Sequence, residues 1–413
     1  MVLRSVTVVG GSLAGLRTAE ALRREGFDGT IRIIGAEDHL PFDRPPLSKQ
    51  VLAGTWDPER ARLRGADDID VEWLLGRRAA ALDVAARTVT LDTGERIDGD
   101  AVVIATGAAP RRLPARLAPP DLGGVHVLRT IGDCLALAAD LAGSPRVVVI
   151  GAGFIGSEVA ATAKGMGCDV TVVEALPVPL ERALGPLMGP LCAGLHRDHG
   201  VTVRLGIAVS GLEGGQDGRV AAVRLADGSS LEADVVVVGV GVAPETAWLE
   251  GSGLTLRDGV VCDDHCRAAP GIVAAGDVAR WRHPGLGTDL RVEHWTNAAE
   301  QAQAAALTLL HGSAAPAYAP IPYFWSDQHG TKIQFVGHNE PGDTVTIAEG
   351  TVDEGRFVAA YHREGRLTAA LLWNRPARVP YWLDRLSEAA TGHRAEAQAT
   401  AEAQATAGDP APA

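Results

Sequence analysis

The order of apolar and polar positions near the start of the chain predicts a strand, a tight turn, a helix and a second strand. Val6–Val9 is an apolar run rich in β-branched residues, which is typical of a buried strand. After a glycine-rich turn, Leu13–Arg24 carries apolar residues at helical spacing, and Gly26 ends that helix. Thr30–Ile34 reads as the next strand. This order of elements indicates a parallel sheet.

The same order of elements returns later in the chain. Arg146–Ile150 reads as a strand, Ile155–Lys164 as a helix, Gly165–Gly167 as a turn and Val170–Val173 as a strand. A glycine-rich turn again separates the strand from the helix. The duplication predicts an α/β fold with two Rossmann-like dinucleotide-binding domains.

The remaining segments divide into further strands, a third domain and a tail. Apolar runs that end in small residues or in Gly-Asp lie within 101–114, 234–244 and 271–281. From Pro316 to about Leu386, prolines, aromatic residues and alternating strands predict a smaller α+β domain. From about Glu388 the chain is mostly Ala, Glu, Gln, Thr and Pro, which predicts a disordered tail.

The composition is that of a globular chain with 46% hydrophobic and 22% charged residues, and a length of 413 residues suits two or three domains. The formal net charge of -13 makes binding to nucleic acid or to an anionic membrane surface a poor expectation. Because the sequence has no uninterrupted apolar run of about 18 residues, we expect no membrane span.

The cysteines give an expectation about the cellular compartment. The chain has 5, scattered along its length and without a CxxC pair. Together with a start that turns strand-like too soon for a signal peptide, they predict a cytoplasmic protein with reduced thiols. Cys262 and Cys266 are the nearest two, but without a second pair they do not indicate zinc. We therefore expect no metal site.

The second glycine turn, GAGFIG, has the spacing of a pyrophosphate-binding turn. Gly151 allows the tight turn, Gly153 lets the backbone approach a pyrophosphate, and Gly156 lets the helix pack closely on the strand. The helix N-terminus offers free N–H groups and a positive dipole to the phosphates. Glu174 ends the next strand, where a carboxylate accepts ribose hydroxyls and repels a 2′-phosphate. This turn predicts a site for NADH in preference to NADPH.

The first glycine turn, GGSLAG, departs from that spacing. Gly10 and Gly15 are in place, but Ser12 stands where the middle glycine is expected. We expect its hydroxyl to donate to a phosphate and so to offset part of the lost space. The next strand ends in a short acidic stretch, in which Glu37 is the first candidate for the ribose ligand and Asp38 the second.

Two dinucleotide turns together with the stretches Ala105-Thr106-Gly107 and Gly276-Asp277 resemble the two-dinucleotide-binding flavoproteins, in which one site holds FAD and the other NAD(P)H. In that resemblance Asp277 accepts a hydrogen bond from the ribityl chain; a second interpretation is that Asp277 caps a helix. No cysteine precedes Cys134, so the dithiol relay of the disulfide reductases is excluded.

Four further stretches, DRPPLSK, LRTIGD, RVEHWTNA and YFWSDQHGTKIQFVG, resemble the NADH-dependent ferredoxin reductases of the putidaredoxin reductase type. The resemblance covers residues 1 to about 390. It implies a glutathione-reductase-like arrangement with an FAD domain over 1–112 and 242–318, an NADH domain over 113–241 and a C-terminal reductase domain over 319–388. The composition of residues 389–413 predicts the disordered tail, for which the family offers no counterpart.

The resemblance also implies the residues that contact each cofactor. For FAD they are Gly10, Ser12, Leu13, Ala14, Gly15, Glu37, Arg44, Lys49, Ala79, Ala105, Thr106, Gly107, Arg129, Gly276, Asp277, Glu293, His294 and Trp295. For NADH they are Gly151, Gly153, Phe154, Ile155, Gly156, Glu158, Glu174, Arg182 and Gly241.

Some of these residues are expected to do more than bind. Lys49 is implied near the reactive edge of the flavin, where a cation stabilises the anionic reduced form, and a buried ammonium needs a partner. Glu158 is the predicted partner, and this pair is the predicted catalytic group. Arg44 suits the FAD pyrophosphate as a planar donor. Trp295 is implied along the flavin with its backbone N–H toward the pyrimidine end.

The function implied is transfer of electrons from NADH to FAD as hydride, and then singly to an iron–sulfur ferredoxin that feeds a cytochrome P450 or a ring-hydroxylating oxygenase. Candidates for a basic ferredoxin-docking rim are Arg64, Arg77-Arg78 and Arg111-Arg112, and an ordinary solvated surface is an equal alternative for each of them. Alternatives are a rubredoxin reductase, an NADH oxidase or peroxidase, which the missing cysteine disfavours, and a flavin redox sensor similar to apoptosis-inducing factor.

Overall fold

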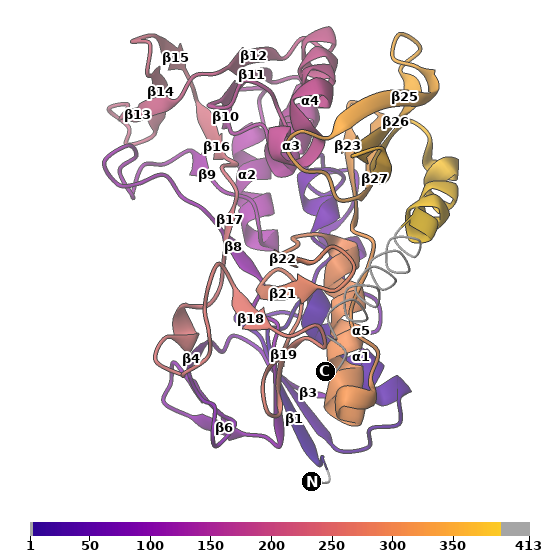
Figure 1. Ribbon diagram of the computed structural model, residues 1–413. Coiled ribbons are helices and arrows are strands. Elements are labelled where there is room, and N and C mark those ends of the chain that lie inside the picture. The colour runs from indigo at the N-terminus through magenta and orange to yellow at the C-terminus, as the bar shows by residue number, and fades with distance from the viewer. Residues whose placement is uncertain (1–2, 390–413) are drawn as a thin grey trace, which may run out of the picture.

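The computed structural model describes residues 3–389. The first large sheet has the strand order β19-β20-β7-β1-β2-β3 and is parallel except at β19. Its strands are β1 (Ser5–Val9), β2 (Thr30–Ile34), β3 (Glu72–Leu74), β7 (Ala101–Ile104), β19 (Arg267–Ala269) and β20 (Ile272–Ala274). Helix α1 (Leu13–Arg24) follows β1 and contacts α5 (Trp295–His311). Because β20 pairs with β7, two distant parts of the chain build this unit, which lies in the lower part of Figure 1.

The second large sheet is parallel, has the order β12-β11-β10-β16-β9 and lies in the upper part of Figure 1. Its strands are β9 (Val125–His126), β10 (Arg146–Ile150), β11 (Asp169–Glu174), β12 (Thr202–Leu205) and β16 (Val235–Val238). Helices α2 (Ile131–Leu141), α3 (Phe154–Gly165) and α4 (Glu181–Asp198) belong to the same unit. Val147 and Val149 of β10 pack in one apolar cluster with α2 and α3, whereas Val148 and Ile150 pack in another. The duplicated Rossmann-like α/β fold is confirmed.

Each large sheet has a small antiparallel sheet attached. In the first unit it comprises β4 (Ala79–Asp83), β5 (Thr88–Leu91) and β6 (Arg96–Asp98), and in the second β13 (Val209–Gly214), β14 (Val220–Leu225) and β15 (Ser230–Glu232). The first unit also contains β18 (Val260–Cys262), β21 (Ala279–His283), β22 (Thr288–Leu290) and short 3-10 turns. The duplication predicted from the sequence therefore extends to these side sheets.

The C-terminal region is an antiparallel sheet of order β23-β24-β27-β26-β25, followed by helical residues 379–389. Its strands are β23 (Tyr323–Gln328), β24 (Thr331–Gly337), β25 (Thr344–Thr351), β26 (Arg356–Arg363) and β27 (Arg366–Trp373). Alternate residues of β26 face opposite sides: Phe357 packs in a cluster with Leu184 of α4, and Val358 packs with Trp382. The expected small α+β domain is present, and it is packed against the second unit.

The strands β8 (Ala108–Pro110) and β17 (Val242–Pro244) pair with each other between the two large sheets (Figure 1). The domain limits at 112 and 242 fall beside this pair and stay predictions. The predicted disordered tail lies, apart from residue 389, outside the described residues. Within residues 3–389, no helix is long and apolar enough to cross a membrane.

Both glycine turns are held by the same close backbone contact. A Cβ on Gly15 would lie 1.9 Å from the carbonyl oxygen of Gly10, and a Cβ on Gly156 would lie 2.1 Å from that of Gly151. Gly10 and Gly151 have positive φ angles of 126° and 99°. The helix in each unit can therefore start directly over its strand only because these positions lack a side chain.

We expect Gly156→Ala to lower the free energy of unfolding by about 3 kcal/mol or more, because overpacking against backbone has no flexible group to give way. The matched control is Gly165→Ala at the other end of α3, where a Cβ meets nothing within 4 Å. That change should be neutral or stabilising by up to about 1 kcal/mol. Urea titration of both variants measures the difference, and equal stability of the two would contradict this explanation.

Candidate cofactor site

A cavity of about 720 Å³ lies between the two large sheets and the C-terminal sheet. Most of the residues predicted to bind a cofactor line it: Gly10, Ser12, Leu13, Ala14, Glu37, Arg44, Lys49, Ala79, Ala105, Thr106, Gly107, Arg129, Phe154, Ile155, Glu158, Gly276, Asp277, Glu293, His294 and Trp295. The cavity thus runs from the start of α1 to the start of α3. The first turns of both duplicated helices therefore line the same cavity.

The other predicted residues lie outside the cavity lining: Gly15, Gly151, Gly153, Gly156, Glu174, Arg182 and Gly241. Gly15, Gly151 and Gly156 serve the backbone contacts described above. Glu174 stabilises the glycine turn before α3, because its carboxylate accepts a hydrogen bond from the backbone N–H of Ala152 at 2.7 Å. It also accepts one from the backbone N–H of Leu176 at 2.9 Å. Arg182 and Gly241 are exposed. Because none of these residues lines the cavity, their ligand contacts stay predictions.

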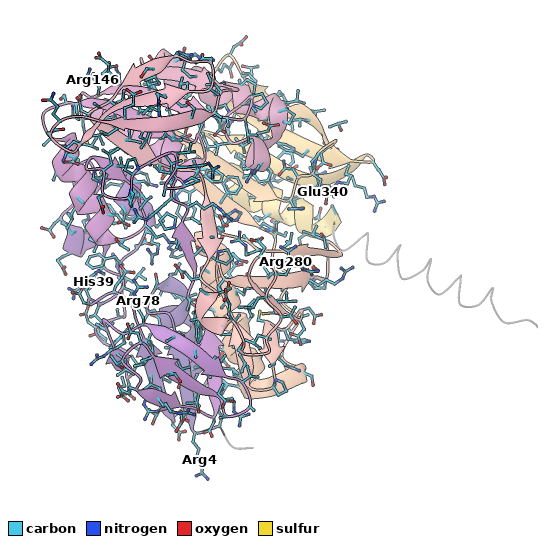
Figure 2. The ribbon with its side chains drawn as sticks, turned by 90° about the vertical axis from the view of Figure 1, so that its left-hand side faces the viewer. Arg4, His39, Arg78, Arg146, Arg280 and Glu340 are labelled. Carbon is cyan, nitrogen blue, oxygen red and sulfur yellow. The ribbon has the colours of Figure 1, made fainter. Side chains whose placement is uncertain are left out.

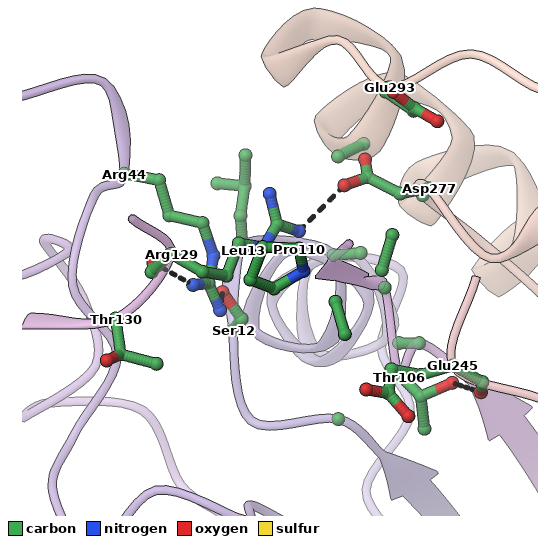
Figure 3. A pocket seen from close by; sticks show the side chains of 18 of the residues that line it. Ser12, Leu13, Arg44, Thr106, Pro110, Arg129, Thr130, Glu245, Asp277 and Glu293 are labelled. Atoms are coloured by element: carbon green, nitrogen blue, oxygen red, sulfur yellow. Dashed lines mark hydrogen bonds and ion pairs between the residues drawn. The ribbon is translucent and has the colours of Figure 1, made fainter. Parts of the chain in front are cut away.

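Two arginines gather at the N-terminus of α1 (Figure 3). Arg44 donates to the carbonyl oxygen of Arg129 and, at 3.3 Å each, to the Ser12 hydroxyl and to Glu37. Arg129 donates to Asp277 at 2.7 Å. Burial and the neighbouring Arg129 guanidinium lower the pKa of Arg44 to about 10. Like charges kept together beside a helix N-terminus form a site for an anion with several oxygens, such as a pyrophosphate.

Gly153 and Ser12 occupy corresponding positions, directly before α3 and α1. Both have extended backbones, with φ of -76° at Gly153 and -123° at Ser12, which any residue can adopt. Apart from its two neighbours in the chain, the nearest atom to a Cβ on Gly153 is the carbonyl oxygen of Gly239, at 4.0 Å. The fold therefore does not require glycine at either position. The open space beside Gly153 is available to a bound ligand.

Lys49 and Glu158 form the ion pair that the sequence predicted. The Lys49 ammonium lies 2.6 Å from a Glu158 carboxylate oxygen, and the two side chains are only 13% and 7% exposed. Lys49 follows the 3-10 turn η1 (Pro45–Ser48) of the first unit, and Glu158 is on α3 of the second. A buried charge pair therefore joins the two units at the cavity.

Trp295 begins α5, so its backbone N–H belongs to the first turn of a helix and has no partner within that helix. Its indole N–H donates to the carboxylate of Asp43 at 2.8 Å. Burial raises the pKa of Asp43, and the hydrogen bond from Trp295 opposes that rise. Glu293 pairs with Arg291 at 2.6 Å. The structure thus fixes the Trp295 ring, while its contact with a flavin stays a prediction.

One interpretation of Asp277 was wrong. It does not cap a helix, because strand β21 follows it, and its carboxylate instead holds Arg129. Within residues 3–389, Arg129 Nε and His294 Nδ1 are buried without a hydrogen-bond partner, and both residues line the cavity. These unpaired polar atoms are what a cavity built for a polar ligand would present.

Sequence reasoning missed several lining residues, among them Phe42, Asp43, Ser48, Phe324 and Trp325. All five lie in or next to the stretches PFDRPPLSK and YFWSDQ, so the quoted motifs contained them without assigning them. Arg77, Arg78 and Arg112, predicted for a docking rim, are exposed residues of the cavity wall. In Figure 2, Arg78 and His39 are labelled on the left-hand side, at about half the height of the molecule.

Comparison with known proteins identifies two family matches. Residues 4–302 match the family described as pyridine nucleotide-disulphide oxidoreductase, and residues 323–406 match the family described as reductase C-terminal. The second match continues past 388, where the sequence predicted the end of the third domain.

Curated relatives and solved structures match over most of the chain. Rhodocoxin reductase of Rhodococcus erythropolis is 40% identical over 86% of this chain and 82% of its own. The ferredoxin reductase component of chlorobenzene dioxygenase from Cupriavidus sp. (strain PS12) is 38% identical over 90% and 89%. A crystal structure of the covalent putidaredoxin reductase–putidaredoxin complex matches with a TM-score of 0.89 and 33% identity, over 93% of each chain.

The imidazole of His294 provides a pH test of this cavity. Burial lowers its pKa from 6.5 to about 4. Because this folded-state value lies below the ordinary one, we expect His294 to contribute stability above pH 6.5 and to lose it as the pH falls toward about 4. An NMR titration of histidine-labelled protein, with the signal assigned by His294→Asn, should show a ring that is still mostly neutral at about pH 5 and is half protonated only near about 4. A midpoint near 6.5 would contradict the burial of this ring.

Proposed function

The chain belongs to the pyridine nucleotide-disulphide oxidoreductase family, and from this membership and the cavity we propose an FAD-dependent NADH:ferredoxin reductase. The observation that carries the proposal is that one cavity reaches the starts of both α1 and α3, with Lys49 and Glu158 joined between them. A two-cofactor electron transfer needs this arrangement, because the two dinucleotides must meet. The curated relatives include reductase components that serve dioxygenases, which supports a ferredoxin as the acceptor.

Residues of the first unit, together with Arg129 of the second, fit FAD. We propose that the pyrophosphate lies at the N-terminus of α1, between Arg44 and Arg129, where free N–H groups and two guanidiniums converge. Glu37 lines the cavity and Asp38 does not, which favours Glu37 as the ribose ligand. The remaining predicted FAD residues, Gly10 to Gly15, Ala79, Ala105 to Gly107, Gly276, Asp277 and Glu293 to Trp295, keep the roles proposed for them.

The start of α3 fits NADH. Gly153 leaves open backbone at the helix N-terminus, and Phe154 and Ile155 follow it on the cavity wall. Glu174 is held in place by two backbone N–H groups, and each of its oxygens keeps a free lone pair for a ribose hydroxyl. We propose that this carboxylate selects NADH over NADPH, and that Arg182 and Gly241 lie at the rim of the same site.

Bound FAD supplies two-electron chemistry with NADH and one-electron chemistry with an iron–sulfur ferredoxin. The chain supplies position and charge. Lys49 places a cation on the cavity wall, where it favours a reduced, more negative ligand. The five cysteines are free and buried, and none of them lines the cavity. A thiol relay is therefore not part of the proposal, which disfavours an NADH oxidase or peroxidase.

We further propose that residues 1–112 and 242–318 form the FAD domain, 113–241 the NADH domain and 319–388 the C-terminal domain. The pairing of β20 with β7 and of β8 with β17 supports this division. The free, buried thiols support a reducing compartment, and we place the protein in the cytoplasm. Its ferredoxin would in turn serve a cytochrome P450 or a ring-hydroxylating oxygenase.

The decisive assay reduces the purified yellow protein anaerobically with NADH and then adds a dioxygenase-type ferredoxin. We expect rapid loss of flavin absorbance followed by rapid reduction of the ferredoxin. Transfer to a rubredoxin alone would instead identify a rubredoxin reductase. Slow reduction with a long-lived charge-transfer band would identify a sensor similar to apoptosis-inducing factor, and absence of bound FAD would refute the proposal.

A Gly153→Ala variant separates ligand binding from folding. The protein leaves room for the new methyl group, so the thermal midpoint and the FAD content should not change. The methyl group does occupy the space proposed for the NADH pyrophosphate, and NADH should bind at least about tenfold more weakly, a loss of about 1.4 kcal/mol. The control, Gly165→Ala in the same helix, should leave NADH affinity as it is. Unchanged affinity in Gly153→Ala would remove the pyrophosphate from this position.

A further inference from the structure

The Glu158 carboxylate binds more than Lys49. Within the described part of the chain it accepts four hydrogen bonds, and its two oxygens divide them. One oxygen accepts from the Ser48 hydroxyl at 2.5 Å and from the Lys49 ammonium at 2.6 Å. The other accepts from the Ser326 hydroxyl at 2.8 Å and from the backbone N–H of Asp327 at 3.3 Å. Glu158 itself is 6% exposed.

These donors come from separate parts of the fold. Ser48 and Lys49 belong to the η1 segment of the first unit, and Glu158 to α3 of the second. Ser326 and Asp327 are on β23 of the C-terminal sheet. A single buried carboxylate of the second domain is therefore hydrogen-bonded to the other two proposed domains, and it lies on the cavity wall.

The hydrogen bond from Ser326 has a fixed direction. Ser326 is fully buried, and its oxygen accepts from the side-chain amide of Gln328 at 3.1 Å. The hydroxyl proton is then free to donate to Glu158. Gln328 is also fully buried. In this series of hydrogen bonds, Gln328 donates to Ser326 and Ser326 donates to Glu158. The Glu158 carboxylate also accepts from Lys49.

We propose that Ser326, oriented by Gln328, is a positioning residue that sets how strongly Glu158 holds Lys49, and so lets the C-terminal domain tune the charge at the cofactor cavity. The proposal rests on the proposed function only in taking FAD as the occupant of that cavity. A carboxylate that shares its charge among several donors attracts any one of them less. Loss of the Ser326 donor should therefore draw Lys49 closer to Glu158 and leave less positive potential for a reduced ligand.

The test measures the equilibrium between oxidised and reduced flavin, rather than turnover, at a fixed solution potential set against a reference dye. In Ser326→Ala the ratio of reduced to oxidised flavin should fall at least about threefold, since one hydrogen bond to a charged group is lost. Ser326→Thr keeps the hydroxyl and should restore the parent ratio. The matched control is Ser157→Ala, next to Glu158 on α3: Ser157 is equally buried, but its hydroxyl has no hydrogen-bond partner among the described residues.

A double variant shows whether Ser326 acts through Glu158. In a Glu158→Gln background the carboxylate charge is gone, so adding Ser326→Ala should leave the flavin ratio where Glu158→Gln alone puts it. The inference would be overturned if Ser326→Ala lowered the flavin ratio equally in both backgrounds, or did not lower it in the parent protein. The proposed function would survive either result, provided that NADH still reduces the protein. A parent protein that does not bind FAD would overturn the proposed function and the inference with it.

Discussion

The buried ion pair of Lys49 and Glu158 is the contact on which the site depends. Two charges removed from water are costly, and their mutual attraction alone does not reliably compensate. Here the carboxylate also has two hydroxyl groups and one backbone N–H as donors, so its charge is satisfied without relying on Lys49 alone. The ammonium can therefore be buried at the cavity wall and still act on a ligand there. The same contacts fix the position of α3 against the other two proposed domains.

The two glycine turns show which parts of the motif serve the fold and which serve a ligand. A Cβ on Gly15 or Gly156 would collide with the turn of its own unit. A Cβ on Gly10 would collide with the backbone of Ala105, and one on Gly151 with the backbone of Gly239. None of these four glycines can therefore gain a side chain without moving main chain. The middle position has no such constraint, since Gly153 has open space around it. Among the three glycine positions of the motif, the middle one is therefore where the fold tolerates a side chain, and we propose that the change to Ser12 acts on the ligand.

Much of the fold could be predicted because its signals are local. Strand–turn–helix units can be recognised within about 30 residues from apolar spacing and glycines. The predicted helix Leu13–Arg24 is α1, with the same bounds. The contacts that complete the site are not local. Asp43 and Trp295 are 252 positions apart, and Ser326 and Glu158 are 168 apart. No periodic pattern encodes such pairs. The Lys49–Glu158 pair was predictable only because a buried cation requires a partner. The family resemblance placed Lys49 near the reactive edge of the flavin, and Glu158 was the candidate partner on the first turns of the NADH-site helix.

The arginines at α1 explain how Ser12 is used. Arg129 has a short ion pair of 2.7 Å with Asp277, whereas Arg44 reaches both Glu37 and Ser12 at 3.3 Å. Contacts of that length are weak, so Arg44 retains donors for a stronger acceptor. Ser12 accepts from Arg44 through its oxygen, which leaves its hydroxyl proton pointing elsewhere. An anion at the helix N-terminus would be met by the freed donors of Arg44, by that proton and by the helix N–H groups together. We therefore propose that the serine adds a donor for the anion at the position where glycine would add only space.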